Sequence, residues 1–248
     1  MNRILNYKFQ EKDEQDYKFV PKVAIGDLPL KTNLSGYIPQ IYDQLTIGSC
    51  TGNATAYALT IRRAIEKLPY INPSRLWLYL KARELADSIA TDSGATIRDV
   101  IKATSKFGYP TEKQWPYNIA QFTAQPPAKV AQAAIKNIVK RYEAVGQDPV
   151  SIKACLAEGY PVVLGILVFE SFMSVKTAAT GIVPMPKRGE ANNGGHALVI
   201  VGHDSMAKQY LLVNSWGDQW GDKGYARIPE DYIHNPKLTA DLWRIITV

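Results

Sequence analysis

The chain has 248 residues, of which 46% are hydrophobic and 21% charged, and its formal net charge is +6. This is the composition of a globular protein with one large domain or two closely packed lobes. No run of Lys or Arg is longer than two residues, which argues against a nucleic-acid groove, and no stretch approaches the ~20 apolar residues of a membrane span.

Two features bear on the compartment in which the protein works. Only two cysteines occur, Cys50 and Cys155, which favours a reducing compartment or a scaffold without disulfides. The N-terminus contains no apolar core of signal-peptide length. We therefore expect a cytoplasmic protein or one exported by a signal-independent route, and the sequence does not decide between them.

Residues 1–27 are polar and of mixed charge, and they precede the regular patterns of the remaining chain. Their aromatic residues alternate as in extended structure: Tyr7, Phe9, Tyr17 and Phe19. We interpret the segment as an ordered arm, a short pro-segment or a terminal tail. Residues 28–42 are rich in turn formers, and we expect coil and a short strand there.

The chain from Cys50 to Gly108 has the apolar periodicity of helices. A first helix begins at Cys50 and is stopped by Pro69, since proline lacks the backbone N–H that a helix needs. A second helix follows Asn72-Pro73-Ser74, which is a typical helix start. A third includes residues 97–104 and is closed by Gly108 as a C-terminal cap.

After Pro110 the pattern becomes mainly β. Two helices interrupt it, one after Pro127 and one capped by Asp148. Apolar, β-branched segments bounded by glycines and turns predict strands at 138–145, 161–169, 196–203, 209–213, 224–228 and 242–248.

These patterns predict an α+β fold with two lobes. We expect a domain over residues 28–248, with a helical lobe over about 44–110 and a β lobe over about 111–248. Two lobes of different class imply a cleft between them, and ligand sites usually lie in such a cleft.

Four polar residues suggest chemistry in that cleft. Cys50 stands at a predicted helix N-terminus, where the backbone dipole favours the thiolate, and Gln44 lies close enough to donate a hydrogen bond nearby. Cys50 alone would more often be a buried structural thiol. However, His196 opens one predicted strand and Asn214 follows another, so antiparallel neighbours would join a base and an orienting amide to this nucleophile.

Three sequence blocks carry a resemblance to a known family. They are Gln44…Gly48-Ser49-Cys50, Gly194-Gly195-His196-Ala197, and Asn214-Ser215-Trp216-Gly217-Asp218-Gln219-Trp220-Gly221 followed by Gly224-Tyr225. With these blocks in order over roughly residues 28–248, the chain resembles papain-like cysteine peptidases. It is more similar to divergent bacterial and viral members than to the lysosomal ones. The resemblance implies a helical lobe, an antiparallel β-barrel-like lobe and an active site in the cleft between them.

The resemblance also implies a role for each residue. The implied catalytic residues are Cys50, His196, Asn214 and Gln44. The implied substrate-binding residues are Ser93, Gly94, Gly195 and Trp216. The thiolate would attack a peptide carbonyl, the amide would stabilise the oxyanion, and water would hydrolyse a thioester acyl-enzyme. The implied substrate is a peptide or protein. We expect no metal or cofactor, because the three His and two Cys show no metal-ligand spacing.

Two positions depart from the family pattern. The position three before the nucleophile, usually a disulfide-bonded Cys, is Ile47, and the position after it, usually Trp, is Thr51. Gly94 has no neighbouring Cys that could complete the bridge. We therefore expect the usual disulfide to be absent and apolar packing to replace it.

Several alternatives stay open. An exopeptidase or a peptide ligase would share the same residues, and a non-catalytic binding or inhibitory relative would share the fold. The intact set of four residue types argues against the last. We also hypothesise that residues 1–27 lie across or near the cleft and inhibit the protein until they move or are cut; the alternative is a surface arm that only packs. We expect Cys155 to be an inert core thiol and His203 to be a surface or turn residue.

Overall fold

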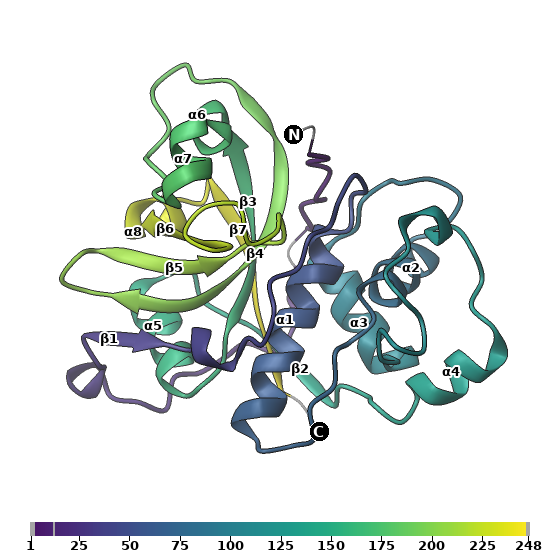
Figure 1. The fold of residues 1–248 in the computed structure, drawn as a ribbon. Coiled ribbons are helices and arrows are strands. Elements are labelled where there is room, and N and C mark those ends of the chain that lie inside the picture. Colours follow the sequence, from purple (N-terminus) through teal and green to yellow (C-terminus); the bar gives the residue numbers. More distant parts are fainter. Residues whose placement is uncertain (1–2, 12, 247–248) are drawn as a thin grey trace.

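The structure is a computed structural model, and it describes residues 3–11 and 13–246. One group of helices gathers on one side of the molecule, and the strands gather on the other together with the remaining helices, so that Figure 1 shows two lobes side by side. The longest helix, α1 (Cys50–Ile65), lies between them and packs on both the other helices and the sheet. The predicted α+β fold with two lobes is confirmed.

The helical lobe forms much as the sequence predicts. Its helices are α1, α2 (Arg75–Leu85), α3 (Ile97–Phe107) and α4 (Ala128–Ala134). The side chain of Ser74 accepts a hydrogen bond from the N–H of Trp77 and so caps α2. Gly108 ends α3 with a φ of 65°, which glycine adopts without steric cost.

The other lobe is one antiparallel sheet. Its strands are β1 (Lys31–Asn33), β2 (Arg141–Ala144), β3 (Val162–Phe169), β4 (Asn192–Asp204), β5 (Gln209–Val213), β6 (Tyr225–Pro229) and β7 (Thr239–Ile246). They are ordered β2-β7-β3-β4-β5-β6, and β1 pairs with β4. Within the described residues β2 and β6 do not pair with each other, so the expected barrel-like lobe is an open sheet.

Short helices complete the structure. In the β lobe these are α5 (Pro149–Ala157), α6 (Glu170–Met173), α7 (Val175–Thr180) and α8 (Glu230–His234). Three single 3-10 turns span Ile25–Asp27, Ser35–Tyr37 and Ile119–Gln121. Of the four β-lobe helices, the sequence predicts only α5, whose N-cap Asp148 accepts a hydrogen bond from the N–H of Ser151.

The segment that joins the two lobes differs from the expectation. The N–H of Tyr109 donates to the carbonyl of Asn137 at 3.0 Å, and that of Val139 donates to the carbonyl of Thr104 at 3.4 Å. These bonds hold residues 109–139 against α3, and Figure 1 shows α4 on the helical side. The lobe boundary that we expected at residue 110 therefore lies just before β2.

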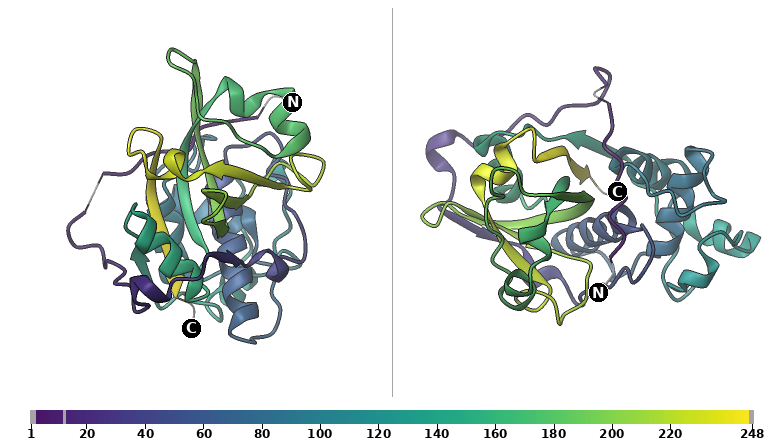
Figure 2. Two further views of the ribbon diagram at one scale, coloured as in Figure 1. Left: turned by 90° about the vertical axis from the view of Figure 1, so that its left-hand side faces the viewer. Right: turned by 90° about the horizontal axis from the view of Figure 1, so that it is seen from above.

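The N-terminal arm is anchored in the β lobe. The N–H of Phe19 donates to the carbonyl of Ala144 at 2.8 Å, and the N–H of Ala144 donates to the carbonyl of Tyr17 at 2.7 Å. Phe19 is buried, and the guanidinium of Arg244 lies 3.8 Å from the centre of its ring. From this anchor the arm leads back to residues 3–8, which run between the lobes (Figure 2).

Two smaller expectations have different outcomes. Cys155 is a buried free thiol, as predicted. His203 is 2% exposed, which corrects the prediction of a surface or turn residue: it lies within β4 between two neighbouring strands, opposite Thr32 of β1 and Tyr210 of β5. Burial lowers the pKa of His203. No helix in residues 3–11 and 13–246 is long and apolar enough to cross a membrane.

The ion pairs around Arg244 yield a stability prediction. Its guanidinium bonds to Glu143 at 2.7 Å and to Glu158 at 3.0 Å, with side-chain exposures of 7%, 7% and 14%. We expect Arg244→Met to lower the free energy of unfolding by about 3 kcal/mol. The change removes the positive partner of two buried carboxylates and the guanidinium that covers the ring of Phe19. Urea denaturation measures the loss of stability.

A matched control exists in Arg227, whose pair with Asp222 at 3.2 Å is 49% exposed on both sides. We expect Arg227→Met to change the free energy of unfolding by less than about 1 kcal/mol. If the two variants lost equal stability, the anchoring role of Arg244 would be wrong.

Candidate active site

The predicted catalytic residues lie around the place where α1 packs on β4. Cys50 is the first residue of α1, and Gln44 lies in the loop that precedes it. His196 lies in β4, and Asn214 follows β5 directly. Because β4 and β5 are antiparallel, with Val199 opposite Val213, the two side chains lie on neighbouring strands at the same edge of the cleft.

The imidazole of His196 is held on two sides. Its Nε2 lies 2.8 Å from Oδ1 of Asn214. The ring of Trp216 stacks on it, with 4.8 Å between ring centres and 28° between planes. Its Nδ1 is buried and has no hydrogen-bond partner among the described residues, so this atom is available to accept a proton from the thiol. The predicted pairing of His196 with Asn214 is thus present.

The thiol and the imidazole are both removed from water. Cys50 and His196 have 0% exposure, and the thiol lies beside the backbone of Ala197. Burial raises the pKa of Cys50 to about 11. Burial also lowers the pKa of His196 to about 4, and the positive charge of Arg3 lowers it further. In this closed form burial thus opposes ionisation of both groups, which is the direction opposite to that of the helix dipole on which the thiolate prediction rested.

The amide of Gln44 is fixed at both ends. Its Nε2 donates to the carbonyl of Ile47 at 3.1 Å, and its Oε1 accepts from the hydroxyl of Ser215 at 2.8 Å. Its backbone N–H donates to the carbonyl of Ser215 at 2.8 Å. The same Nε2 faces the carbonyl of Ile4 at 3.5 Å. The side chain that we predicted as an oxyanion donor therefore already points at a carbonyl oxygen of the arm.

The arm fills the cleft beside these residues. The N–H of Tyr7 donates to the carbonyl of Gly195 at 3.2 Å, and that of Lys8 donates to the carbonyl of Ala95 at 3.3 Å. A Cβ atom at any of five glycines would approach within 3 Å of arm atoms: Gly48, Gly94, Gly165, Gly194 and Gly195. The absence of side chains makes room for the backbone of the arm at Gly94, Gly194 and Gly195, and for arm side chains at Gly48 and Gly165.

Both ends of this cleft segment are anchored. Arg3 pairs with Asp43 at 2.5 Å and donates to the carbonyl of Trp216 at 2.9 Å. At the other end, the ring of Tyr7 packs on Gly165 and its hydroxyl donates to Asp241. Burial raises the pKa of both Tyr7 and Asp241, so the Tyr7 hydroxyl keeps the proton that it donates to Asp241.

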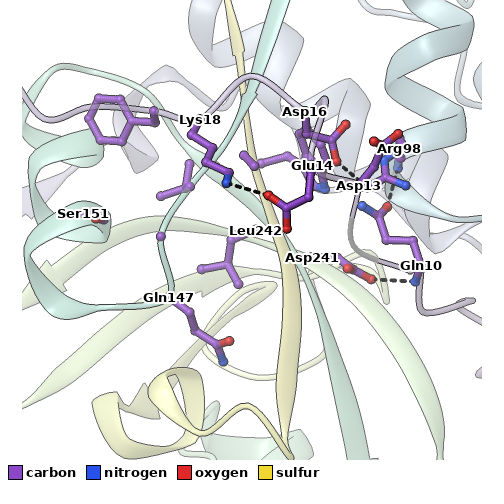
Figure 3. A pocket seen from close by; sticks show the side chains of 15 residues that line it. Gln10, Asp13, Glu14, Asp16, Lys18, Arg98, Gln147, Ser151, Asp241 and Leu242 are labelled. Carbon is purple, nitrogen blue, oxygen red and sulfur yellow. Dashed lines mark hydrogen bonds and ion pairs between the residues drawn. The ribbon is translucent and has the colours of Figure 1, made fainter.

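A separate cavity of about 480 Å³ lies behind Asp241. Figure 3 shows it beside residues of the arm that include Gln10, Glu14 and Lys18, where Lys18 faces Glu14 and the N–H of Gln10 donates to Asp241. None of the predicted catalytic or substrate-binding residues lines it. No group of three or more His, Cys, Asp or Glu side chains in the described residues could hold a metal ion.

The predicted substrate-binding residues have different positions. Gly94, Gly195 and Trp216 contact the arm. The hydroxyl of Ser93 instead bonds to Ser88 at 3.0 Å and to the carbonyl of Gly94, so it does not face the arm.

Three residues that sequence reasoning missed belong to the site. They are Ser215, Ala95 and Asp241. Ser215 follows Asn214 and Ala95 follows Gly94, both of which the sequence analysis singled out. This adjacency is the signal by which the sequence could have indicated them. Asp241 lies in no motif, and only the folded structure brings it to the cleft.

Comparisons with known proteins agree on one family. A sequence model of the papain family cysteine proteases matches residues 30–241. An uncharacterized peptidase C1-like protein of Acanthamoeba polyphaga mimivirus is 38% identical over 96% of this chain and 81% of its own length. The crystal structure of xylellain, a cysteine protease from Xylella fastidiosa, superposes with a TM-score of 0.92 at 35% identity, covering 98% of this chain and 96% of the other. A cathepsin B-like protein, CP3 of Giardia intestinalis, is 29% identical over 77% of this chain, which spans 64% of its length.

The closed site yields a pH prediction. In a Cys50→Ser variant, where no thiol is coupled to the imidazole, we expect the NMR titration of His196 to show a pKa near 4. Without residues 1–9 that pKa should return toward its ordinary value near 6.5, because water again reaches the ring. A His196→Gln spectrum assigns the signal.

The sign of the effect follows from these two values. A histidine whose pKa is depressed in the closed form stabilises closure above about pH 6.5 and loses this contribution as the pH falls through about 4. The raised pKa of Asp241 acts in the opposite direction. An unchanged His196 pKa after removal of the arm would contradict the prediction.

Proposed function

The chain belongs to the papain family of cysteine proteases, and we propose that it is a cysteine endopeptidase whose reaction is carried by Cys50, His196 and Asn214. It is a hydrolase of peptide bonds. One observation supports the proposed triad above the others: Nε2 of His196 lies 2.8 Å from Asn214, while its unpartnered Nδ1 remains for the thiol.

The proposed reaction begins when Nδ1 of His196 takes the proton of the Cys50 thiol. The sulfur attacks the carbonyl carbon of the scissile peptide bond, and the carbonyl electrons move to oxygen. The side-chain amide of Gln44 and the backbone N–H of Cys50 stabilise this oxyanion, each by about 3–4 kcal/mol. Support for Gln44 comes from its present contact with the Ile4 carbonyl at 3.5 Å.

Collapse of this intermediate breaks the C–N bond. His196 gives its proton to the leaving amine, and Cys50 remains as a thioester. His196 then takes a proton from water, whose oxygen attacks the thioester carbonyl. Collapse of the second intermediate breaks the C–S bond, His196 returns its proton to the sulfur, and the carboxylic acid product leaves and loses its proton to water.

Asn214 and Trp216 are proposed to position the imidazole rather than to react. The hydrogen bond to Asn214 sets the orientation of the ring, which keeps Nδ1 toward Cys50. The stacked Trp216 ring excludes water from that bond. Phe172 and Trp220 pack against Trp216, with ring centres 5.5 and 5.2 Å away, and hold it in place.

The course of the arm favours an endopeptidase over an exopeptidase. Residues 3–8 pass through the cleft as a continuous chain, with Arg3 at Trp216 and Lys8 at Ala95. A cleft that admits a polypeptide on both sides of the nucleophile suits cleavage within a chain, whereas an exopeptidase closes one side. The alternative is a peptide ligase, which would use the same acyl-enzyme with an amine in place of water as the acceptor.

We also propose that the arm inhibits the enzyme. Among the described residues of the arm, residues 3–8 lie in the cleft, and with them in place Cys50 has no exposed surface. Residues 17–19 pair with Ala144 and belong to the fold. Removal of only the first nine residues is therefore a sharper test than truncation at Asp27, which would also remove the buried Phe19.

The nucleophile is tested by covalent labelling. We expect one adduct of a thiol-directed epoxysuccinyl probe on the chain that lacks residues 1–9, measured by intact mass at pH 6–7. The adduct disappears in Cys50→Ala and persists in Cys155→Ala, because Cys155 is buried in the β lobe. No adduct on the shortened chain would rule out the proposed nucleophile.

Inhibition by the arm is tested with a fluorogenic peptide library. We expect removal of residues 1–9, or Tyr7→Ala in the full chain, to raise the hydrolysis rate at least about tenfold, since Tyr7 is the buried anchor of the cleft segment. Tyr17→Ala, at an arm residue that is 64% exposed, serves as the control and should leave the rate unchanged. An unchanged rate in all three proteins would favour an arm that only packs.

A further inference from the structure

The cleft wall on the helical side consists of two segments that must keep their spacing. One is the loop from Gln44 to Cys50, and the other is the turn from Asp92 to Ala95. In the family pattern a disulfide that begins three residues before the nucleophile ties this loop down. Here that position is Ile47, and both cysteines of the chain are free thiols. Ile47 is buried, as the expectation of apolar packing requires. Apolar packing is not directional, however, so it does not by itself fix the position of the loop relative to the turn.

A carboxylate joins the two segments instead. The N–H of Gly48 donates to both oxygens of Asp92, at 3.0 and 2.9 Å. The hydroxyl of Tyr79, in α2, donates to Oδ1 of Asp92 at 2.5 Å and accepts from the N–H of Gly94 at 3.0 Å. Burial and this carboxylate raise the pKa of Tyr79, so its hydroxyl keeps the proton that it donates.

The atoms held in this way adjoin those that the reaction uses. Gly48 lies between Ile47, whose carbonyl accepts from the Gln44 amide, and Ser49, which precedes Cys50. Gly94 precedes Ala95, whose carbonyl accepts from Lys8 of the arm. A shift of Gly48 relative to Asp92 would therefore move the oxyanion donors relative to the backbone that binds the peptide.

We propose that Asp92, with Tyr79, is a positioning residue that replaces the missing disulfide and holds the oxyanion-hole loop in register with the substrate-binding turn. Its negative charge also opposes ionisation of the nucleophile, because it is one of the groups that raise the pKa of Cys50. The two effects make opposite contributions to activity. Loss of the carboxylate should make the thiol easier to ionise and the enzyme slower.

The hydrogen bonds are tested without reference to activity. In the full chain we expect the Gly48 amide to be protected from hydrogen exchange and to exchange at least about tenfold faster in Asp92→Asn, because the charge-assisted acceptor is lost. Asp87→Asn, an exposed change of equal charge in the same loop region, is the control and should leave Gly48 protected. Equal exchange in the two variants would overturn the proposal.

The kinetic part of the inference rests on the proposed peptidase function. In the full chain with Tyr7→Ala, we expect Asp92→Asn to lower kcat about tenfold with a smaller change in KM, and to lower the pKa of Cys50 in a pH series of alkylation rates. Tyr79→Phe, which keeps the ring and loses the hydroxyl, should lower kcat to a lesser extent without the pKa change. Asp87→Asn should match the parent.

The two proposals fail in different ways. A parent that shows no Cys50-dependent hydrolysis contradicts the peptidase function, while the exchange experiment still decides the role of Asp92. An active parent whose Asp92→Asn variant keeps kcat within twofold overturns the positioning role. If Asp92→Asn lowers the thermal midpoint substantially, Tyr79→Phe supplies the comparison in a more conservative variant.

Discussion

The packing of α1 against β4 is the contact on which the site depends. It brings the thiol of Cys50, from one lobe, to the backbone of Ala197, which follows His196 in β4 of the other, and both side chains are fully buried there. Ser215 then links the two sides by bonding to the backbone and side chain of Gln44. Because this junction belongs to the hydrophobic core, the geometry of the site is maintained by the same burial that stabilises the fold.

Sequence patterns anticipated those elements whose signals are local. Ser74, Asp148 and Gly108 act as caps, and the β-branched strands pair antiparallel as expected, which placed His196 beside Asn214. The four-residue helix α6 carries no comparable periodic signal, because so short a helix is stabilised by its tertiary contacts. The lobe boundary was misplaced for a similar reason. The alanine-rich composition of α4 does not indicate the lobe on which this helix packs, whereas in the structure the backbone hydrogen bonds of Tyr109 and Val139 hold the segment that contains it on the helical lobe.

The chemistry of the site was less predictable than its residues. The helix dipole at Cys50 argues for a thiolate, but its effect is limited to the first turn, whereas burial acts on the whole group. With the arm in place burial raises the pKa of Cys50 and lowers that of His196, so it opposes the charged form of both. The role of Asp92 was hidden because a carboxylate in a turn is ordinarily solvated, and only the fold places the N–H of Gly48 against it.

The anchoring of the arm at Phe19 makes it a ligand tethered to its own binding site. About ten residues separate the β2 pairing from Tyr7, and so short a connection gives the cleft segment an effective concentration on the order of millimolar or higher. Dilution of the protein would not weaken such a contact. A free peptide of similar affinity would have to reach a similar concentration to displace the cleft segment. The closed form would therefore favour substrates that are abundant or that bind at more than one point.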